Sequence, residues 1–80
     1  MAQQTATGNG QAISNIEYDL LTVLHNKAEA VQAYDSYIQD AQSMGSQPCA
    51  ELFQKLKESE IQQVQEIREH LTQVMQHGKM

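Results

Sequence analysis

The sequence predicts an all-α protein, an antiparallel two-helix hairpin that dimerises into a four-helix bundle. Apolar residues recur at helical spacing from residue 13 to about residue 76, and the segment MGSQP interrupts this pattern once. No segment carries a strand pattern. A chain of 80 residues makes at most one domain and buries only about 60% of the surface that its unfolded form exposes. A lone hairpin is therefore marginal, and self-association is expected.

The N-terminal half predicts a tail followed by a long helix. Residues 1 to 12 are small and polar, include Gly8 and Gly10, and are expected to form a flexible tail. The hairpin is expected over residues 13 to 77, and its first helix over about residues 13 to 44, with Ser14 or Asn15 available as the N-terminal cap. The apolar stripe of this helix comprises Ile13, Ile16, Leu20, Leu24, Val31, Tyr34, Ile38 and Ala41.

The segment MGSQP predicts a short turn at residues 45 to 47. Gly45 can adopt the left-handed conformation that follows a helix, Ser46 can cap a new helix, and Pro48 suits the first turn of that helix. The second helix is expected over about residues 48 to 76, before Gly78, and it must run antiparallel to the first because the turn is short. Its stripe comprises Leu52, Phe53, Leu56, Val64, Ile67, Leu71 and Val74.

Two helices with one apolar stripe each leave a groove when they pack as a pair. A second hairpin closes that groove into a four-helix bundle, most commonly as a symmetric dimer. We therefore expect a homodimer or a higher homo-oligomer.

Composition narrows the partners and the compartment. Ten Asp and Glu residues against five Lys and Arg give a net charge of -5, so nucleic acid is not an expected partner. No apolar run reaches the roughly 20 residues that span a bilayer, and the N-terminus lacks the features of a signal peptide. We expect a cytoplasmic protein without a membrane partner. The single Cys49 is interpreted as a small apolar side chain, with an intermolecular disulfide as the alternative.

One charged residue lies in each apolar stripe. Lys27 belongs to the seven-residue row of Leu20, Tyr34 and Ala41, and Glu60 belongs to the row of Phe53, Ile67 and Val74. Since the helices are antiparallel, Lys27 and Glu60 are expected to meet within about one helical turn of offset. Either Lys27 extends to water from the edge of the stripe, or it forms a buried pair with Glu60 to which Gln63 and Tyr34 supply hydrogen bonds.

Two helical motifs resemble the ferritin-like superfamily. The first is E-A-x-x-x-Y at residues 29 to 34, and the second is L-F-x-x-L-x-x-x-E at residues 52 to 60. The chain is most similar to half-length members, the encapsulated ferritins and rubrerythrin-type halves, over about residues 20 to 72. The resemblance implies a dimeric bundle with a di-iron centre held by a carboxylate seven residues before the tyrosine and by an E-x-x-H motif.

Carried onto this chain, the resemblance implies a degenerate di-iron site. Tyr34 matches the tyrosine and Glu60 matches the glutamate of E-x-x-H, whereas Lys27 replaces the first glutamate and Gln63 replaces the histidine. The Lys27 ammonium would take the place of the lost cation, so no cofactor is expected. Glu29 matches only a neighbouring acidic position and points away from the stripe.

Two further pairs have the spacing of weak metal sites. His25 and Glu29, and likewise Glu66 and His70, lie four residues apart on one helix face. Each pair supplies only two ligands, so we interpret both pairs as parts of solvated polar faces, with a weak surface metal site as the alternative.

Three functions follow from these observations. The favoured one is a metal-free ferritin-like homo-oligomer that serves as a structural or interaction module rather than as an enzyme. The first alternative is an iron-binding or ferroxidase-like protein with unusual ligands at an oligomer interface. The second alternative is a hairpin that binds a helix of an unknown protein partner in its groove. Lys27 and Gln63 favour the first function, because an ammonium repels a cation and an amide replaces imidazole poorly.

Overall fold

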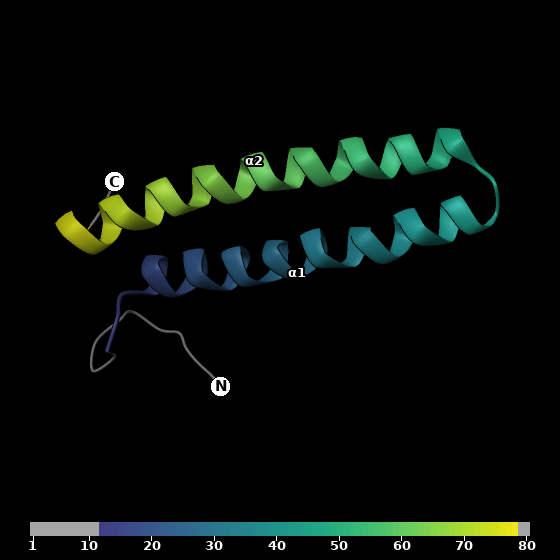
Figure 1. Ribbon diagram of the computed structural model, residues 1–80. Coiled ribbons are helices and arrows are strands. Elements are labelled where there is room, and N and C mark those ends of the chain that lie inside the picture. The colour runs from purple at the N-terminus through teal and green to yellow at the C-terminus, as the bar shows by residue number, and fades with distance from the viewer. Residues whose placement is uncertain (1–11, 79–80) are drawn as a thin grey trace.

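The computed structural model describes residues 12–78 and shows two antiparallel α-helices that lie side by side (Figure 1). Helix α1 spans Asn15–Ser43 and helix α2 spans Gln47–His77, against predicted ranges of 13 to 44 and 48 to 76. No strand occurs within the described range. The expected tail lies outside the described residues, except for residue 12. The hairpin measures 53 × 26 × 12 Å, so it is a flat, single layer of helices.

Serine side chains cap the N-termini of both helices. The hydroxyl of Ser14 accepts a hydrogen bond from the backbone N–H of Glu17 at 3.2 Å, and that of Ser46 accepts one from the N–H of Cys49 at 3.4 Å. Each bond satisfies one of the backbone donors that a helix start leaves without a partner. Pro48 lies in the first turn of α2, where its missing N–H costs nothing.

The turn between the helices is a Schellman motif built on Gly45. Gly45 has a φ of 74°, in the left-handed region that glycine adopts without steric cost. The N–H of Ser46 donates to the carbonyl of Ala41 at 2.9 Å, and the N–H of Gly45 donates to that of Gln42 at 3.0 Å. Both bonds satisfy carbonyls at the end of α1 and direct the chain back along it.

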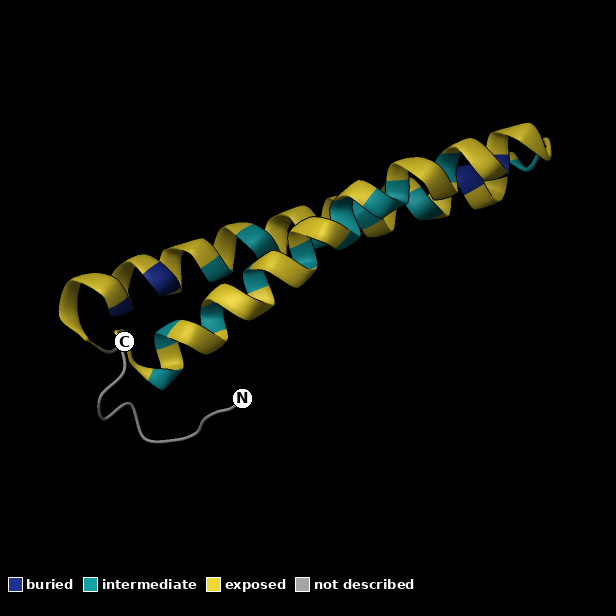
Figure 2. Ribbon diagram, turned by 90° about the horizontal axis from the view of Figure 1, so that it is seen from below, coloured by how far each residue is buried: buried dark blue, intermediate teal, exposed yellow. Residues whose placement is uncertain are grey.

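The two helices meet along rows of residues spaced alternately three and four apart. This alternation keeps one face of each helix against the other, as in an antiparallel coiled coil. The buried and half-buried residues of these contact rows form a band between the helices (Figure 2). The α1 contact row comprises Leu20, Leu24, Lys27, Val31, Tyr34, Ile38 and Ala41, and the α2 contact row comprises Ala50, Phe53, Lys57, Glu60, Val64, Ile67, Leu71 and Val74.

The fully buried residues lie towards the two ends of the hairpin. Ala41 and Ala50 are 6% and 5% exposed beside the turn, and Leu71 and Val74 are 8% and 3% exposed towards the other end (Figure 2). The middle of the contact is only half-buried, and Lys27 and Glu60 lie there. A charged pair therefore interrupts a thin apolar core.

The predicted stripes are wider than the contact between the helices. Ile16, Leu52 and Leu56 were expected on the stripes but remain 49%, 50% and 39% exposed. Ile16 and Leu56 occupy rows beside the contact rows, and Leu52 lies in a hollow that it forms with Pro48, Glu51 and Lys55 of its own helix. One partner helix covers only the residues spaced three and four apart. Conversely, Lys57 belongs to the α2 contact row, where its ammonium nitrogen lies 2.6 Å from a carboxylate oxygen of Asp35.

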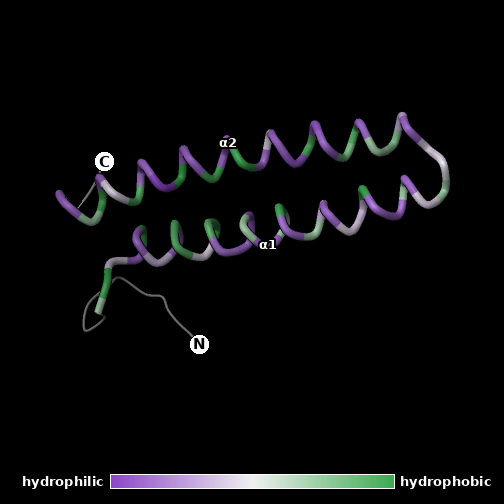
Figure 3. The backbone as a smooth tube through the Cα atoms, viewed as in Figure 1, coloured by the Kyte–Doolittle hydropathy of each residue, from purple (hydrophilic) through white to green (hydrophobic). Residues whose placement is uncertain are grey.

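Hydropathy varies around each helix rather than along it. Apolar residues alternate with polar ones at each turn of both helices (Figure 3). In the part of the chain that the structure describes, neither helix has an apolar stretch long enough to cross a membrane.

Candidate functional site

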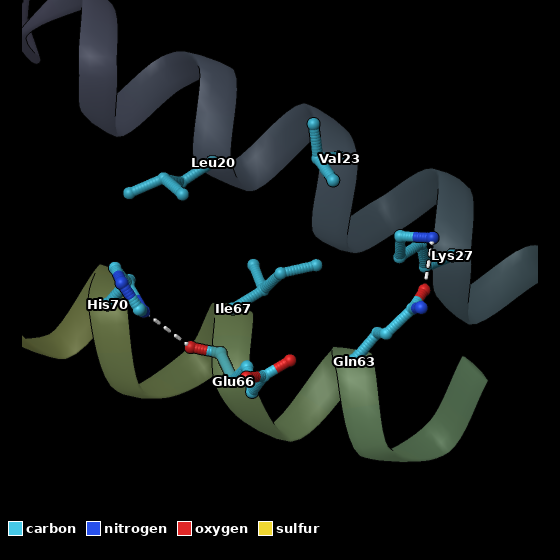
Figure 4. Close-up of a pocket in the computed structure, with 7 residues that line it drawn as sticks. All are labelled: Leu20, Val23, Lys27, Gln63, Glu66, Ile67 and His70. Atoms are coloured by element: carbon cyan, nitrogen blue, oxygen red, sulfur yellow. Dashed lines mark hydrogen bonds between the residues drawn. The ribbon is translucent and has the colours of Figure 1, made fainter. Parts of the chain in front are cut away.

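The Lys27 side chain joins the two helices at mid-length. Its ammonium nitrogen donates to a carboxylate oxygen of Glu60 at 3.2 Å and to the side-chain oxygen of Gln63 at 2.8 Å. Figure 4 shows Lys27 reaching from α1 to Gln63 on α2. Glu60 and Gln63 lie three residues apart, so both side chains project from the same face of α2 towards Lys27. We call these three residues the Lys27 cluster.

The Lys27 cluster is electrically neutral and partly shielded from water. The side chains of Lys27 and Glu60 are 30% and 24% exposed. Two of the three ammonium protons have acceptors in the cluster, and the remaining one is left for water or for another chain. Water still screens a pair of this exposure, so its net contribution to stability is about 1 kcal/mol or less.

Tyr34 lies seven residues, about two helical turns, from Lys27, on the side nearer the turn between the helices. Its ring packs edge-on against Tyr37, with ring centroids 5.5 Å apart, and Tyr37 in turn lies 5.9 Å from the ring of Phe53. Such edge-on and tilted contacts are favourable for aromatic rings. Tyr34 therefore belongs to an aromatic cluster that spans both helices beside the Lys27 cluster.

The donor atoms around Lys27 do not fit a di-iron centre within one hairpin. One carboxylate oxygen of Glu60 and the amide oxygen of Gln63 already accept hydrogen bonds from the ammonium group. One carboxylate and one amide supply too little negative charge and no imidazole, whereas iron sites in helical bundles use several glutamates and histidines. Among residues 12–78, no three His, Cys, Asp or Glu side chains gather closely enough to hold a metal ion.

The two surface pairs differ from each other. His25 Nε2 lies 3.6 Å from Glu29 Oε2, and both side chains are largely in water, at 71% and 68% exposure. His70 instead directs Nδ1 to the backbone carbonyl of Glu66 at 3.0 Å, so this pair does not bring imidazole and carboxylate together (Figure 4). The exposed position of Glu29 agrees with its predicted direction away from the stripe.

A groove of about 480 Å³ lies beside the Lys27 cluster, between the two helices (Figure 4). Val23 on its rim is 42% exposed, and sequence reasoning missed this residue. The signal that identifies it is the seven-residue spacing of Ile16, Val23, Ala30 and Tyr37, a second apolar row beside the α1 contact row. The groove is lined by Leu20, Val23, Lys27, Gln63, Glu66, Ile67 and His70.

Comparison of the chain with known protein families, with curated proteins and with solved structures finds no match. Its residues and their contacts therefore supply the evidence for its function.

Proposed function

We propose that this protein is a metal-free, ferritin-like homo-oligomer that serves as a structural or interaction module. The observation that carries the proposal is the contact of the Lys27 ammonium with both Glu60 and Gln63, at 3.2 and 2.8 Å. In the ferritin-like pattern these three positions would supply metal ligands. Here a side-chain cation supplies the positive charge that offsets the Glu60 carboxylate.

The Lys27 cluster favours one alignment of the helices along the bundle. In a dimer, two Lys27 and two Glu60 side chains form a neutral polar layer across the middle of four helices. A shift along the helices would place these charges against apolar residues, which is costly. A buried polar layer of this kind specifies alignment even where it adds little stability.

Incomplete burial supports self-association. In residues 12–78, only four hydrophobic residues are buried, and each of them keeps 3% to 8% of its surface exposed. Large apolar side chains such as Tyr37 and Leu56 remain 45% and 39% exposed. A second hairpin would cover such residues, whereas a single flat layer of helices does not.

Titration with ferrous iron tests the metal-free part of the proposal. The wild-type protein is expected to show no saturable binding in its core and to oxidise ferrous iron no faster than buffer does. Saturable binding of about two irons per dimer, as in two-metal sites, that disappears in Glu60→Ala would instead establish the iron-binding alternative. His25→Ala serves as the control for adventitious binding at the exposed His25 and Glu29 pair.

The open groove favours one further candidate, a hairpin that binds a helix of another protein. Amphipathic helices dock into apolar grooves in this way. That function requires the free hairpin to keep its groove open, so it requires a folded monomer in solution. A stable homodimer would favour the homo-oligomeric function.

A further inference from the structure

An outer row of apolar residues runs beside the contact row of α1, from the first turn of the helix to the residue that caps its C-terminus. Its members are seven residues apart, and every one of them is apolar. Ile16, Val23, Tyr37 and Met44 are 49%, 42%, 45% and 84% exposed, although a helix in water gains nothing from exposing them. Ala30, which is half-buried, lies at the centre of the row. We call this set the outer row: Ile16, Val23, Ala30, Tyr37 and Met44.

The two broad faces of the flat hairpin differ in chemistry. The face with the outer row also carries the groove and the exposed Leu56, which is in the same row of α2 as the groove residues Gln63 and His70. On the opposite face, the matching row of α1 begins with Leu21 and continues with Ala28, Asp35 and Gln42. Its Asp35 forms the ion pair with Lys57, and glutamines and Glu51 line a hollow beside Ala50. Only the outer-row face presents α1 as a continuous apolar surface.

We propose that a second copy of the chain docks on this face, with the outer rows of the two α1 helices packed antiparallel across a two-fold axis at Ala30. The proposal rests on the homo-oligomeric function and adds the face and the orientation of the interface. In such an isologous contact, each residue meets the one equally far from Ala30 on the other side. Val23 then faces Tyr37 of the second copy, and Ile16 faces its Met44.

The sizes of the side chains along the outer row suit an antiparallel pairing of two copies. The smallest side chain, Ala30, lies at the axis, where two helices approach most closely, and larger side chains lie seven and fourteen residues away on both sides. The broad face of 53 × 26 Å can also supply the about 800 Å² per partner that a stable interface buries. The face is therefore large enough for a stable interface with an identical copy.

Charge is compatible with this arrangement. Lys27 lies three residues from Ala30, so the Lys27 clusters of both copies would lie near the axis. Each cluster pairs its ammonium with Glu60 at 3.2 Å, so neither copy brings an unpaired charge to the centre. The remaining ammonium proton of each Lys27 would find an acceptor within the polar layer.

The alternative orientation, in which the two α1 helices run parallel, covers the outer row less well. With the two-fold axis along the helices, α1 of one copy would lie over α2 of the other. The row of α2 on that face begins with Cys49 and Leu56 but continues with Gln63 and His70. Ile16 and Val23 would then face the polar half of that row. The antiparallel orientation instead covers the outer row with an apolar row along its whole length.

Disulfide cross-linking tests the axis and the orientation. Ala30→Cys in a Cys49→Ser background is expected to form an intermolecular disulfide under mild oxidation, because the two thiols would meet at the axis. Ala28→Cys in the same background is the matched control, since it lies on the opposite face of the same helix. Rapid cross-linking at position 28 with none at position 30 would overturn the proposal.

Charge insertion tests the face independently. Val23 and Leu21 are equally exposed, at 42% and 40%, but lie on opposite broad faces. Val23→Glu is expected to raise the dimer Kd at least about 100-fold, because it buries an unpaired carboxylate, and Leu21→Glu is expected to leave the Kd unchanged. Circular dichroism controls for folding, and if Val23→Glu unfolds, the cross-linking result decides. A folded wild-type monomer would refute the proposed function itself, whereas a dimer broken only by Leu21→Glu would refute this face alone.

Discussion

The ammonium nitrogen of Lys27 lies 3.2 Å from the carboxylate of Glu60, a residue 33 positions away in the chain. Gln63 accepts a second hydrogen bond from the same nitrogen at 2.8 Å. This contact fixes the offset between α1 and α2 at mid-length. It is also the contact from which the proposed metal-free function is argued.

A double-mutant cycle measures the coupling between these two residues. With Lys27→Met and Glu60→Gln, urea unfolding is expected to give a coupling free energy of about 1 kcal/mol, because each single change leaves a half-buried partner without its counter-charge. The matched control is the Asp35 and Lys57 pair, in which Asp35 is 63% exposed. Its coupling is expected to be below about 0.5 kcal/mol, since water screens the carboxylate. A larger coupling in the control than at Lys27 would contradict the importance of the cluster.

Truncation of a buried leucine measures the packing at the open end of the hairpin. Leu71 is 8% exposed, so Leu71→Ala is expected to lower the free energy of unfolding by about 2 to 4 kcal/mol. Leu21→Ala, at a position that is 40% exposed on the opposite face, is the control and is expected to cost less than about 1 kcal/mol. Equal costs in chemical denaturation would show that the contact rows are wrongly assigned.

The turn depends on the conformation of Gly45. A Cβ atom at this position would meet nothing within 4 Å, so the cost of Gly45→Ala comes from its φ of 74° alone. We expect a loss of about 1 kcal/mol in thermal or urea unfolding. Gly45→Asn should lose less, because asparagine tolerates the left-handed region better than alanine. An alanine variant as stable as the wild type would mean that the turn rearranges without cost.

Most of the hairpin could be predicted from local sequence signals. Gly45, Ser46 and Pro48 mark the turn because each has a conformational or capping preference that acts within a few residues. The meeting of Lys27 with Glu60 and Gln63 followed from seven-residue spacing and from similar distances to that turn. These inferences required only helical geometry and an antiparallel arrangement.

The exact width of the contact could not be predicted in the same way. Leu52 and Leu56 are apolar but lie outside the α2 contact row, so composition alone does not separate residues that face α1 from residues on the other sides of the helix. Lys57 shows the converse, because a charged residue occupies a contact-row position and pairs with Asp35 at 2.6 Å. The metal-free core shared by two copies belongs to the assembly rather than to one hairpin, so it stays a prediction.

Restoring the missing ligands tests whether Lys27 and Gln63 occupy the positions of metal ligands. The variant Lys27→Glu with Gln63→His would gather two glutamates and a histidine in each hairpin, the ligand types that a di-iron centre requires. Without metal it should be less stable than the wild type, because it loses the ammonium that offsets Glu60. Ferrous, cobalt or zinc ions should raise its melting temperature by binding only the folded form, with about 2.7 kcal/mol gained at 100 times the Kd.

The control for this variant is Ala28→Glu with Ile61→His, which adds the same residue types to the broad face opposite the outer row. It should show little response to the same ions, as should the wild type. A response of equal size in the control would mean that any added glutamate and histidine suffice. No response in the Lys27→Glu and Gln63→His variant would refute the ferritin-like alignment of the site.

Sedimentation equilibrium of the wild-type protein after exhaustive treatment with a chelator tests the central claim most directly. The predicted result is a helical species of twice the 9.0 kDa chain mass at micromolar concentration, unchanged when ferrous iron is added back. A folded species of 9.0 kDa that associates only after iron is added would contradict the claim that this bundle assembles without a metal.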